Sequence, residues 1–371
     1  MNFALSDEHL LLRDSARSFL QKEIDLSPLL VPRATVQSAR YQENWRKMVD
    51  LGWPGLIVPE KFGGAGMSPI DLVMVSGEIG RFLAPSPLFG DWAGTLALLK
   101  GGSVTQQERV LPDIASGQIK LALAVCDHDG NADGPKSDSA VRRRGSDFTI
   151  NGTKSFVVDA VDANFLVVAA ELDGARQWYL VDASQSGVEI KLLPWRDTTR
   201  QVCNVSFDGV IAEPLVADDR TLWPWVRDRL LMVLAAESAG GLQHTLASAV
   251  DYAKERVAFG KPIGAFQSIK HTLAEMFGWT EAANAAVLYA AWTLAEESEE
   301  ASSATAMAKA YCTEAYVTAT HQNIQIFGAI GFTWEMKNHL YFKRARANAE
   351  MFGSAATHRA RVIEMVSRAA A

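Results

Sequence analysis

The sequence lacks the features that mark several common classes of protein. Its three cysteines, Cys126, Cys203 and Cys312, stand far apart among 371 residues and form neither a disulfide framework nor a CxxC pair. Long uncharged hydrophobic runs are also missing, because charged residues interrupt the apolar positions even in the opening segment MNFALSDEHLLLRDSARSFL. We therefore expect neither a signal peptide nor a transmembrane span. The few cysteines fit a reducing, cytoplasmic location.

Positive charge is scarce and is not concentrated in a long basic run. Lysine and arginine number 36 against 43 aspartates and glutamates, which gives a formal net charge of −7. This balance argues against a nucleic-acid-binding surface and against a polybasic membrane anchor. Small molecules and other proteins are the expected partners.

Metal-binding and phosphate-binding spacings are missing as well. The segment DHDGNADG (127–134) begins like a calcium loop, but Ala132 stands where the turn needs glycine and Asp138 where a glutamate is expected. The seven histidines are isolated from one another. No GxSxG occurs, and the glycine pairs at 101 and 240 follow no strand pattern. We predict no metal site, no dinucleotide-binding glycine loop and no serine nucleophile.

What the sequence does contain is enough apolar material for large cores, since 48% of its residues are hydrophobic. Residues 1–118 show helical periodicity, and helices are expected near 70–81, 91–99 and 105–115. Ser6, followed by two acidic residues, is expected to cap the first helix. This part of the chain is predicted to be an all-α domain.

From 119 to 217 the pattern changes to that of short strands. Segments such as FLVVAA and QWYLVD are rich in β-branched and aromatic residues and are separated by Gly, Asp and Asn, which is typical of an antiparallel sandwich or barrel. Residues 218–371 return to helical periodicity, and one helix face is predicted to contain Leu242, Leu246, Ala249, Ala253 and Val257. The predicted order is an N-terminal all-α domain, a middle antiparallel β-domain and a C-terminal four-helix-bundle domain.

The segment ERVAFGKPIGAFQ (255–267) separates two long helical patterns by a Gly-Lys-Pro turn. Arg256 and Gln267 flank this turn, and both have side chains long enough to reach a ligand. Arg256 has two interpretations: it complements the carbonyls at the end of a helix, or it binds an anion. Spacing alone does not decide between them.

Four segments, in order along the chain, resemble the acyl-CoA dehydrogenase family. YAKERVAFGKPIGAFQSIKHTLAEM (252–276) is similar to the family's Arg, Phe-Gly, Pro-Ile and Phe-Gln pattern. The other three are LGWPGLIVPEKFGGAG (51–66), INGTKSFVVDAVDANFLVVAA (150–170) and QIFGAIGFTWE (325–335). The resemblance covers the whole chain and implies a helical, β, helical fold with FAD bound between subunits.

The resemblance also implies which residues reach a neighbouring subunit's FAD. The residues that match the family's contacts to the pyrophosphate and adenosine are Arg256, Phe259, Gln267, Gln325 and Gly328. A guanidinium offers a planar fork of donors to phosphate oxygens, and small residues let backbone N–H groups approach an anion. Ala329 stands where a second glycine is usual, which tightens this site.

The carboxylate that removes the α-proton in the family has no evident counterpart. In many members it lies in a Glu-Gly-Thr segment before the last helix, and the matching stretch here, AEMFGSAATHR (349–359), has Phe352 instead. Other members place the base at a position matching Leu230. Of the nearby acids Asp228 and Glu237, Glu237 lies closer to the same helix face. Its alternative interpretation is a helix-packing residue, and we predict no catalytic residue in this chain.

The contacts to the flavin ring are also degraded. Where the family has a Thr-Glu-Pro and Gly-Ser-Asp loop, this chain has CDHDGNADGPKSD (126–138), and where it has Trp-Ile-Thr this chain has Phe156, Val157 and Val158. The side chains that would donate to the ring are absent, whereas the half-site offered to a neighbour is nearly complete.

The sequence therefore resembles the non-catalytic, β-type subunit of heteromeric bacterial steroid-CoA acyl-CoA dehydrogenases, which are FAD-dependent oxidoreductases of lipid and steroid degradation. This implies an α2β2 heterotetramer whose second acyl-CoA dehydrogenase-like subunit carries the base, with an acyl-CoA substrate and an electron-transfer flavoprotein or similar acceptor. A bulky acyl group is implied by the segments GFTWEMKNHLYFKRA and GRFLAPSPL. Two alternatives stay open: a homomeric dehydrogenase or oxidase that uses Glu237 or Asp228 as base, and a flavin-free scaffold of the same fold.

Overall fold

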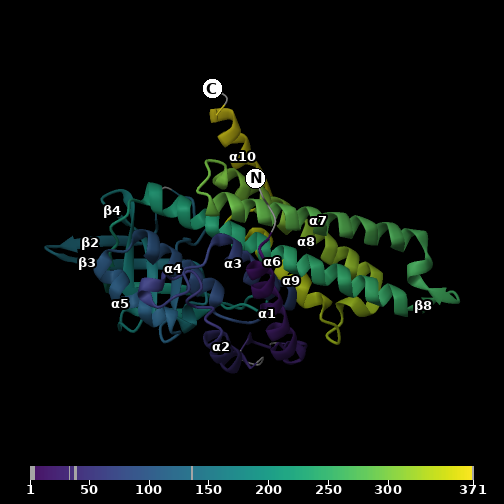
Figure 1. The fold of residues 1–371 in the computed structure, drawn as a ribbon. Coiled ribbons are helices and arrows are strands. Elements are labelled where there is room, and N and C mark those ends of the chain that lie inside the picture. The colour runs from purple at the N-terminus through teal and green to yellow at the C-terminus, as the bar shows by residue number, and fades with distance from the viewer. Residues whose placement is uncertain (1–4, 33, 37–39, 135–136, 370–371) are drawn as a thin grey trace.

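The computed structural model describes residues 5–32, 34–36, 40–134 and 137–369, and Figure 1 shows their arrangement. The N-terminal part is helical, as predicted. Ser6 caps the first helix and shares a capping box with His9. The elements are α1 (Asp7–Glu23), η1 (Ser27–Leu29), α2 (Tyr41–Asp50), η3 (Glu60–Phe62), α3 (Pro69–Phe82), α4 (Leu88–Gly101) and α5 (Val104–Ala115).

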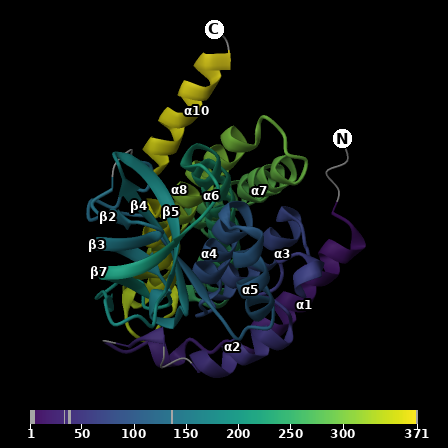
Figure 2. The ribbon, with the colours of Figure 1, turned by 90° about the vertical axis from the view of Figure 1, so that its left-hand side faces the viewer.

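The middle part is a β-barrel that packs beside the N-terminal helices (Figure 2). Its elements are β1 (Leu121–Ala124), β2 (Ala140–Arg144), β3 (Asp147–Val158), η4 (Ala160–Asp162), β4 (Phe165–Leu172), β5 (Ala175–Asp182), β6 (Val188–Leu192) and β7 (Val202–Pro214). Strands β4, β2, β3, β7 and β5 pair in that order, and β5 closes the ring by pairing with β4. Most pairs are antiparallel, but β1 and β2 run parallel to β4. The barrel interior holds its own apolar core, which includes Ile150, Val168 and Val205.

The C-terminal part is a bundle of long helices. Its elements are α6 (Asp219–Glu255), β8 (Val257–Ala258), β9 (Lys261–Pro262), η5 (Ile263–Ala265), α7 (Gln267–Ala295), α8 (Ala301–Phe327), η6 (Gly328–Phe332), α9 (Asn338–Glu350) and α10 (Ala355–Ala369). The predicted turn is the β8–β9 hairpin, which projects from the far end of the bundle in Figure 1, while α10 stands away from the body near the C-terminus.

Close packing of α3 on α6 joins the N-terminal helices to this bundle. A Cβ atom added at Gly80 would lie 2.0 Å from the carbonyl oxygen of Glu237, and one added at Gly240 would lie 1.8 Å from that of Gly77. Since no real Cβ tolerates such distances, glycine at these positions lets the two helix backbones touch. The helical core is consequently continuous across both helical parts and fixes the position of Glu237 on α6.

The fold class predicted from the sequence is confirmed, with local corrections. Strands β2 and β6 were not predicted, and Val257 lies beyond the end of α6 in the exposed β8 strand rather than on the buried helix face. The change from helix to strand falls between Ala115 and Leu121. The division into domains at 118 and 217 remains a prediction. Within the described ranges, no helix is long and apolar enough to cross a membrane.

Candidate functional site

The turn after α6 is built so that its side chains face outward. The backbone N–H of Arg256 donates to the carbonyl of Tyr252, which ends the helix, and the carbonyl of Arg256 accepts from the N–H of Ile263 across the hairpin. Phe259 and Gly260 form the tip with φ values of +53° and +79°. The left-handed conformation at Phe259 turns the chain back within two residues.

The five residues expected to contact FAD, which we call the clamp, lie on two segments. The clamp residues on or beside this hairpin are exposed to solvent. Arg256 and Gln267 are exposed, and the Phe259 side chain is 95% exposed. In the described part of the chain, the guanidinium of Arg256 has neither a hydrogen bond nor an ion pair. The interpretation that its side chain caps the carbonyls of α6 therefore finds no contact to support it.

The second predicted clamp segment lies at the end of α8. Gln325 is exposed, and Gly328 ends the helix with φ +69° and ψ −145°, a conformation that favours glycine. A Cβ atom added at Gly328 would meet nothing within 4 Å, so the space in front of this backbone is open. Ala329, where the family has a second glycine, is exposed as well.

One aromatic pair joins the two clamp segments. The rings of Tyr252 and Phe327 stack with centroids 4.1 Å apart and planes 12° apart, and the Tyr252 hydroxyl lies 3.5 Å from the Phe327 carbonyl oxygen. Tyr252 lies one helical turn before Arg256, and Phe327 directly precedes Gly328. The structure thus fixes the ends of α6 and α8 relative to each other.

The position expected for a catalytic base is filled by an aromatic cluster. Phe352 follows α9 with φ +55° and packs against Phe89 at 6.3 Å and Trp223 at 6.1 Å between ring centroids. Trp223 in turn stacks on Trp178 at 6.0 Å. The cavity beside Phe352 and Phe89 has a volume of about 10 Å³, whereas ligand pockets usually measure roughly 300–1,000 Å³.

Buried polar groups hold the turn that carries Phe352. The ammonium of Lys309 donates to the carbonyls of Ala349 at 3.2 Å and Gly353 at 3.1 Å, and an imidazole nitrogen of His358 lies 3.0 Å from the Phe352 carbonyl oxygen. Burial lowers the pKa of Lys309 to about 8 and that of His358 to about 4. These contacts hold the backbone turn at Phe352 in place.

Glu237, the substitute base considered from the sequence, is held in a buried ionic network. Arg200 donates to both of its carboxylate oxygens at 2.7 Å, and the Arg344 guanidinium lies 3.6 Å away. Burial opposes the charge of Arg344, but Asp197 and Glu237 outweigh it and hold the pKa of Arg344 above its usual value. Both carboxylate oxygens of Glu237 are thus engaged by arginines, and the adjoining cavity is only about 10 Å³.

Asp228, the other acid considered, is equally engaged. Its carboxylate accepts from Arg361 at 2.8 Å and from the Ser302 hydroxyl, and Arg227 lies 3.5 Å away. Its side chain is buried. In the folded chain both acids are therefore engaged by arginine side chains.

The loop that matches the family's flavin-ring contacts uses its polar groups internally. Lys154 is fully buried and donates to Asp127 at 2.6 Å and to Ser137 at 2.6 Å. Arg176 donates to the carbonyls of Ala132 and Gly134, and Asp133 accepts from Trp223 and Arg227. Asp127, the first acid of the calcium-like sequence, is thus engaged in an ion pair with Lys154.

Comparison with known proteins places these features in a family. The model of the acyl-CoA dehydrogenase N-terminal domain matches residues 6–118, and that of the C-terminal domain matches residues 228–367. The chain belongs to the acyl-CoA dehydrogenase family. It is 32% identical over 350 residues to acyl-CoA dehydrogenase IpdE2 of Mycobacterium tuberculosis, with 94% of each chain covered.

Solved structures of the family superpose along the whole chain. The Tcur3481–Tcur3483 steroid acyl-CoA dehydrogenase has a TM-score of 0.86 and 25% identity, with 98% of this chain and 99% of that chain covered. The ChsE4–ChsE5 complex from Mycobacterium tuberculosis has a TM-score of 0.88 and 24% identity, with 99% of both chains covered. At this identity, the similarity to the ChsE4–ChsE5 complex shows that the two chains share a fold.

The clamp residues and the lack of a base stay predictions from the sequence, and the groups that close the interior were not predicted. Arg200, Arg344 and Lys309 received no role, because their partners lie on other elements. Only Lys309 carried a signal, since it lies in the mostly apolar stretch ATAMAKAYC, where an unpaired charge is costly.

Proposed function

We propose that this chain is the non-catalytic, β-type subunit of a heteromeric acyl-CoA dehydrogenase and shares FAD with a partner subunit that carries the catalytic base. The observation that carries the proposal is that the interior around Phe352 is closed while the clamp is exposed. The internal site is closed by Phe352, Phe89 and Trp223, whereas the clamp at the ends of α6 and α8 is exposed and its guanidinium has no described partner.

The residues of the clamp fit the phosphate and adenosine part of FAD. The Arg256 fork suits phosphate oxygens, and the open backbone at Gly328 lets an N–H approach an anion. Phe259 supplies an exposed apolar ring, and Gln267 and Gln325 supply amide donors and acceptors. When bound, FAD would accept the hydride from the substrate's β-carbon. In this chain, the role of the five residues is to hold and orient it.

The substrate proposed is the CoA thioester of a steroid or another bulky acyl group. Support comes from the steroid acyl-CoA dehydrogenase named among the similar structures and from the two-component ChsE4–ChsE5 complex. By the same analogy we propose an α2β2 assembly whose reduced flavin passes electrons to an electron-transfer flavoprotein or similar acceptor. The homomeric alternative needs Glu237 or Asp228 as a base, and both carboxylates are bound to arginines.

Turnover by separated and combined subunits tests the proposal. This chain, a partner acyl-CoA dehydrogenase-like chain and the co-expressed pair would each be assayed with a bulky acyl-CoA and a dye acceptor. We expect turnover by the pair and none by this chain alone. Active, yellow protein from this chain alone would overturn the proposal, and a colourless, inactive pair would favour the flavin-free scaffold.

A further inference from the structure

A wedge opens in the wall of the barrel between β2 and β4. These two parallel strands pair at a single position, Ala140 with Glu171. The residues that follow in β2, from Val141 to Arg144, pair with β3 on one side. In the described part of the barrel no strand pairs with their other side. The wedge is lined by residues 141–145 on one wall and by Leu172 and Asp173 on the other.

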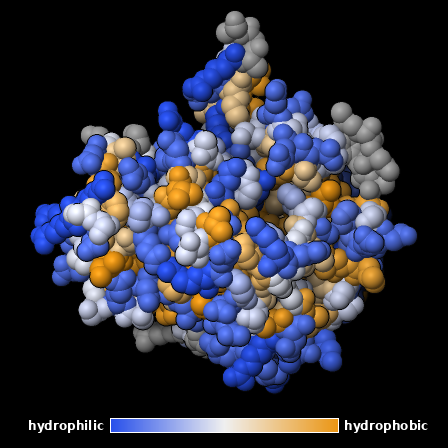
Figure 3. Space-filling view, turned by 60° about the vertical axis from the view of Figure 1, so that its left-hand side comes forward, coloured by the Kyte–Doolittle hydropathy of each residue, from blue (hydrophilic) through white to orange (hydrophobic). Residues whose placement is uncertain are grey.

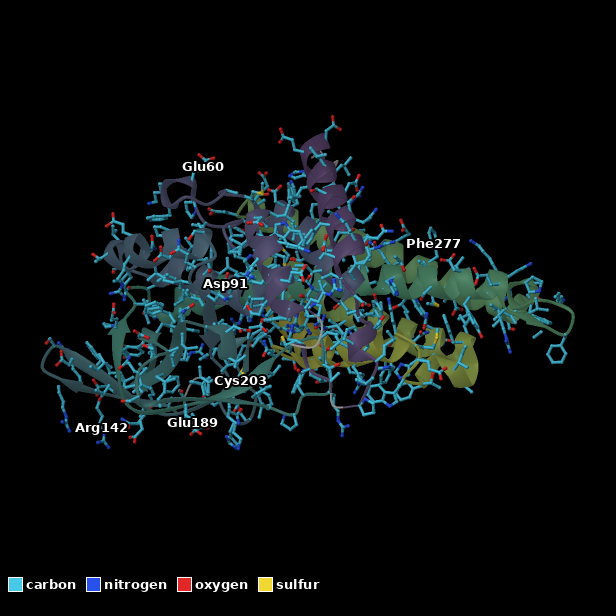
Figure 4. The ribbon with its side chains drawn as sticks, turned by 90° about the horizontal axis from the view of Figure 1, so that it is seen from below. Glu60, Asp91, Arg142, Glu189, Cys203 and Phe277 are labelled. Atoms are coloured by element: carbon cyan, nitrogen blue, oxygen red, sulfur yellow. The ribbon has the colours of Figure 1, made fainter. Side chains whose placement is uncertain are left out.

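The β2 wall of this wedge carries a concentrated positive charge. Arg142, Arg143 and Arg144 are consecutive and exposed, although the chain as a whole has a net charge of −7. Figure 4 shows Arg142 at the outer end of the β2–β3 hairpin, pointing away from the body. The space-filling view shows a strongly hydrophilic projection at its left-hand edge, on the barrel side of the molecule (Figure 3).

The three arginines are not equivalent. Arg143 lies over the Phe148 ring at 5.5 Å and donates to the carbonyl of Gly145. Arg142 and Arg144 alternate with it along the strand and therefore lie on the opposite face. Neither of these two side chains has a hydrogen bond or ion pair within the ranges the structure describes. Arg142 and Arg144 are two residues apart and lie beside an unpaired strand edge. Side chains on one face of a strand that paired with this edge would have the same two-residue spacing.

We propose that this wedge is a docking site for an extended, acidic segment of another protein, which adds to the free edge of β2 as a strand. Backbone hydrogen bonds along β2 would supply affinity, and carboxylates at alternate positions would pair with Arg142 and Arg144. The carboxylates would lie on the face of the added strand that is shared with Arg142 and Arg144, because side chains project from the faces of a sheet. In other proteins, charged side chains on a free strand edge can have a different role, which is to prevent pairing with other strands. If Arg142 and Arg144 have that role, an acidic segment will not bind.

A peptide-binding experiment distinguishes a docking site from an edge that only prevents strand pairing. The purified protein, alone or with its partner as isolated, would be titrated into a fluorescein-labelled peptide of alternating glutamate and valine, and binding would be followed by fluorescence anisotropy. One companion peptide has glutamine in place of glutamate. A second keeps the glutamates but has proline in place of valine, which preserves charge and removes backbone donors.

We expect the glutamate–valine peptide to bind, and both companion peptides to bind at least about tenfold more weakly. Arg142→Glu combined with Arg144→Glu should lower affinity by a similar factor. Arg220→Glu, an exposed arginine on α6, should leave affinity unchanged. If the double variant does not fold, Arg142→Gln with Arg144→Gln replaces it. No binding of the first peptide, or equal binding of the proline peptide, would overturn the proposal.

Discussion

Tyr252 stacks on Phe327 with ring centroids 4.1 Å apart, and this contact joins the end of α6 to the end of α8. Tyr252 and Phe327 are 75 positions apart in the sequence, yet the two segments that they join present all five proposed FAD contacts. A ligand held by both ends depends on their relative position, so a contact that binds no ligand itself would still control affinity.

Replacing Tyr252 with leucine tests this coupling. The substitution keeps an apolar side chain but removes the stacked ring, a contact worth about 0.5–1.5 kcal/mol beyond its buried area. We expect the apo-complex to bind FAD several-fold more weakly, with only a small loss of thermal stability. Tyr289→Leu, which removes a ring near the other end of α7, is the matched control. Equal FAD affinities for the two variants would show that the stacking does not position the clamp.

Arg256→Lys tests the phosphate contact itself. Charge is kept, but an ammonium cannot present the paired donors of a guanidinium. The expected loss is on the order of 1–3 kcal/mol, or about one to two decades in FAD affinity, measured by titration of the apo-complex. Arg220→Lys makes the same chemical change at the opposite end of α6 and should leave affinity unchanged. If Arg256 only complements its helix, both variants will bind FAD as the native protein does.

Glu237→Gln separates a structural carboxylate from a catalytic one. Because Arg200 would lose its buried anionic partner, while Arg344 keeps Asp197, the free energy of unfolding should fall by about 3–5 kcal/mol. Turnover per folded complex should fall less than tenfold, under about 1.4 kcal/mol of barrier.

Glu213 supplies the control for this variant, since it pairs in the same bidentate way with Arg109 but at the surface. Glu213→Gln should cost about 0–1 kcal/mol. If Glu237→Gln instead removes three or more decades of turnover while flavin content stays constant, Glu237 is the base and the homomeric alternative is correct.

Asp91 gives the fold a dependence on pH. It is fully buried in α4, accepts from the N–H of Leu121 at 2.8 Å, and its second oxygen has no described partner. Figure 4 shows it in the interior between the helices and the barrel. Burial raises the pKa of Asp91 to about 8. Since an unfolded aspartate titrates near 3.9, the folded state retains the proton over the interval between, and stability falls as pH rises from about 4 to 8.

Asp91→Asn removes this ionisation and keeps the acceptor for Leu121. Compared with the native protein, the variant should gain about 1–3 kcal/mol between pH 5 and pH 8.5 in urea unfolding. Asp208→Asn, at an exposed aspartate, should show no such gain. Parallel pH curves for Asp91→Asn and native protein would mean that Asp91 does not hold a proton in the folded state.

Much of the fold follows from periodicity, and the exceptions have physical reasons. Strand β2, with the sequence AVRRR, carries one buried residue, Val141, so it shows no apolar alternation. It is a strand because β3 pairs with it along its length. Strand β6 does alternate, with Val188 and Ile190 packed against the barrel core, and the signal was present but short.

The candidate site divides in the same way. The proposed clamp could be predicted from the sequence because its residues lie in two short segments that resemble the family's pattern. The closure of the interior could not, because Phe352 meets Phe89 and Trp223 only when three elements pack together. Glu237 looks like a lone acid until Arg200, on the loop after β6, is placed beside it.

Flavin stoichiometry tests the central claim most directly. The chain would be co-purified with its partner subunit, the two chains quantified separately, and FAD counted by its absorbance after release. The account predicts one FAD for each pair of unlike chains, and little FAD in this chain purified alone. One FAD per copy of this chain in homomeric, active protein would contradict it.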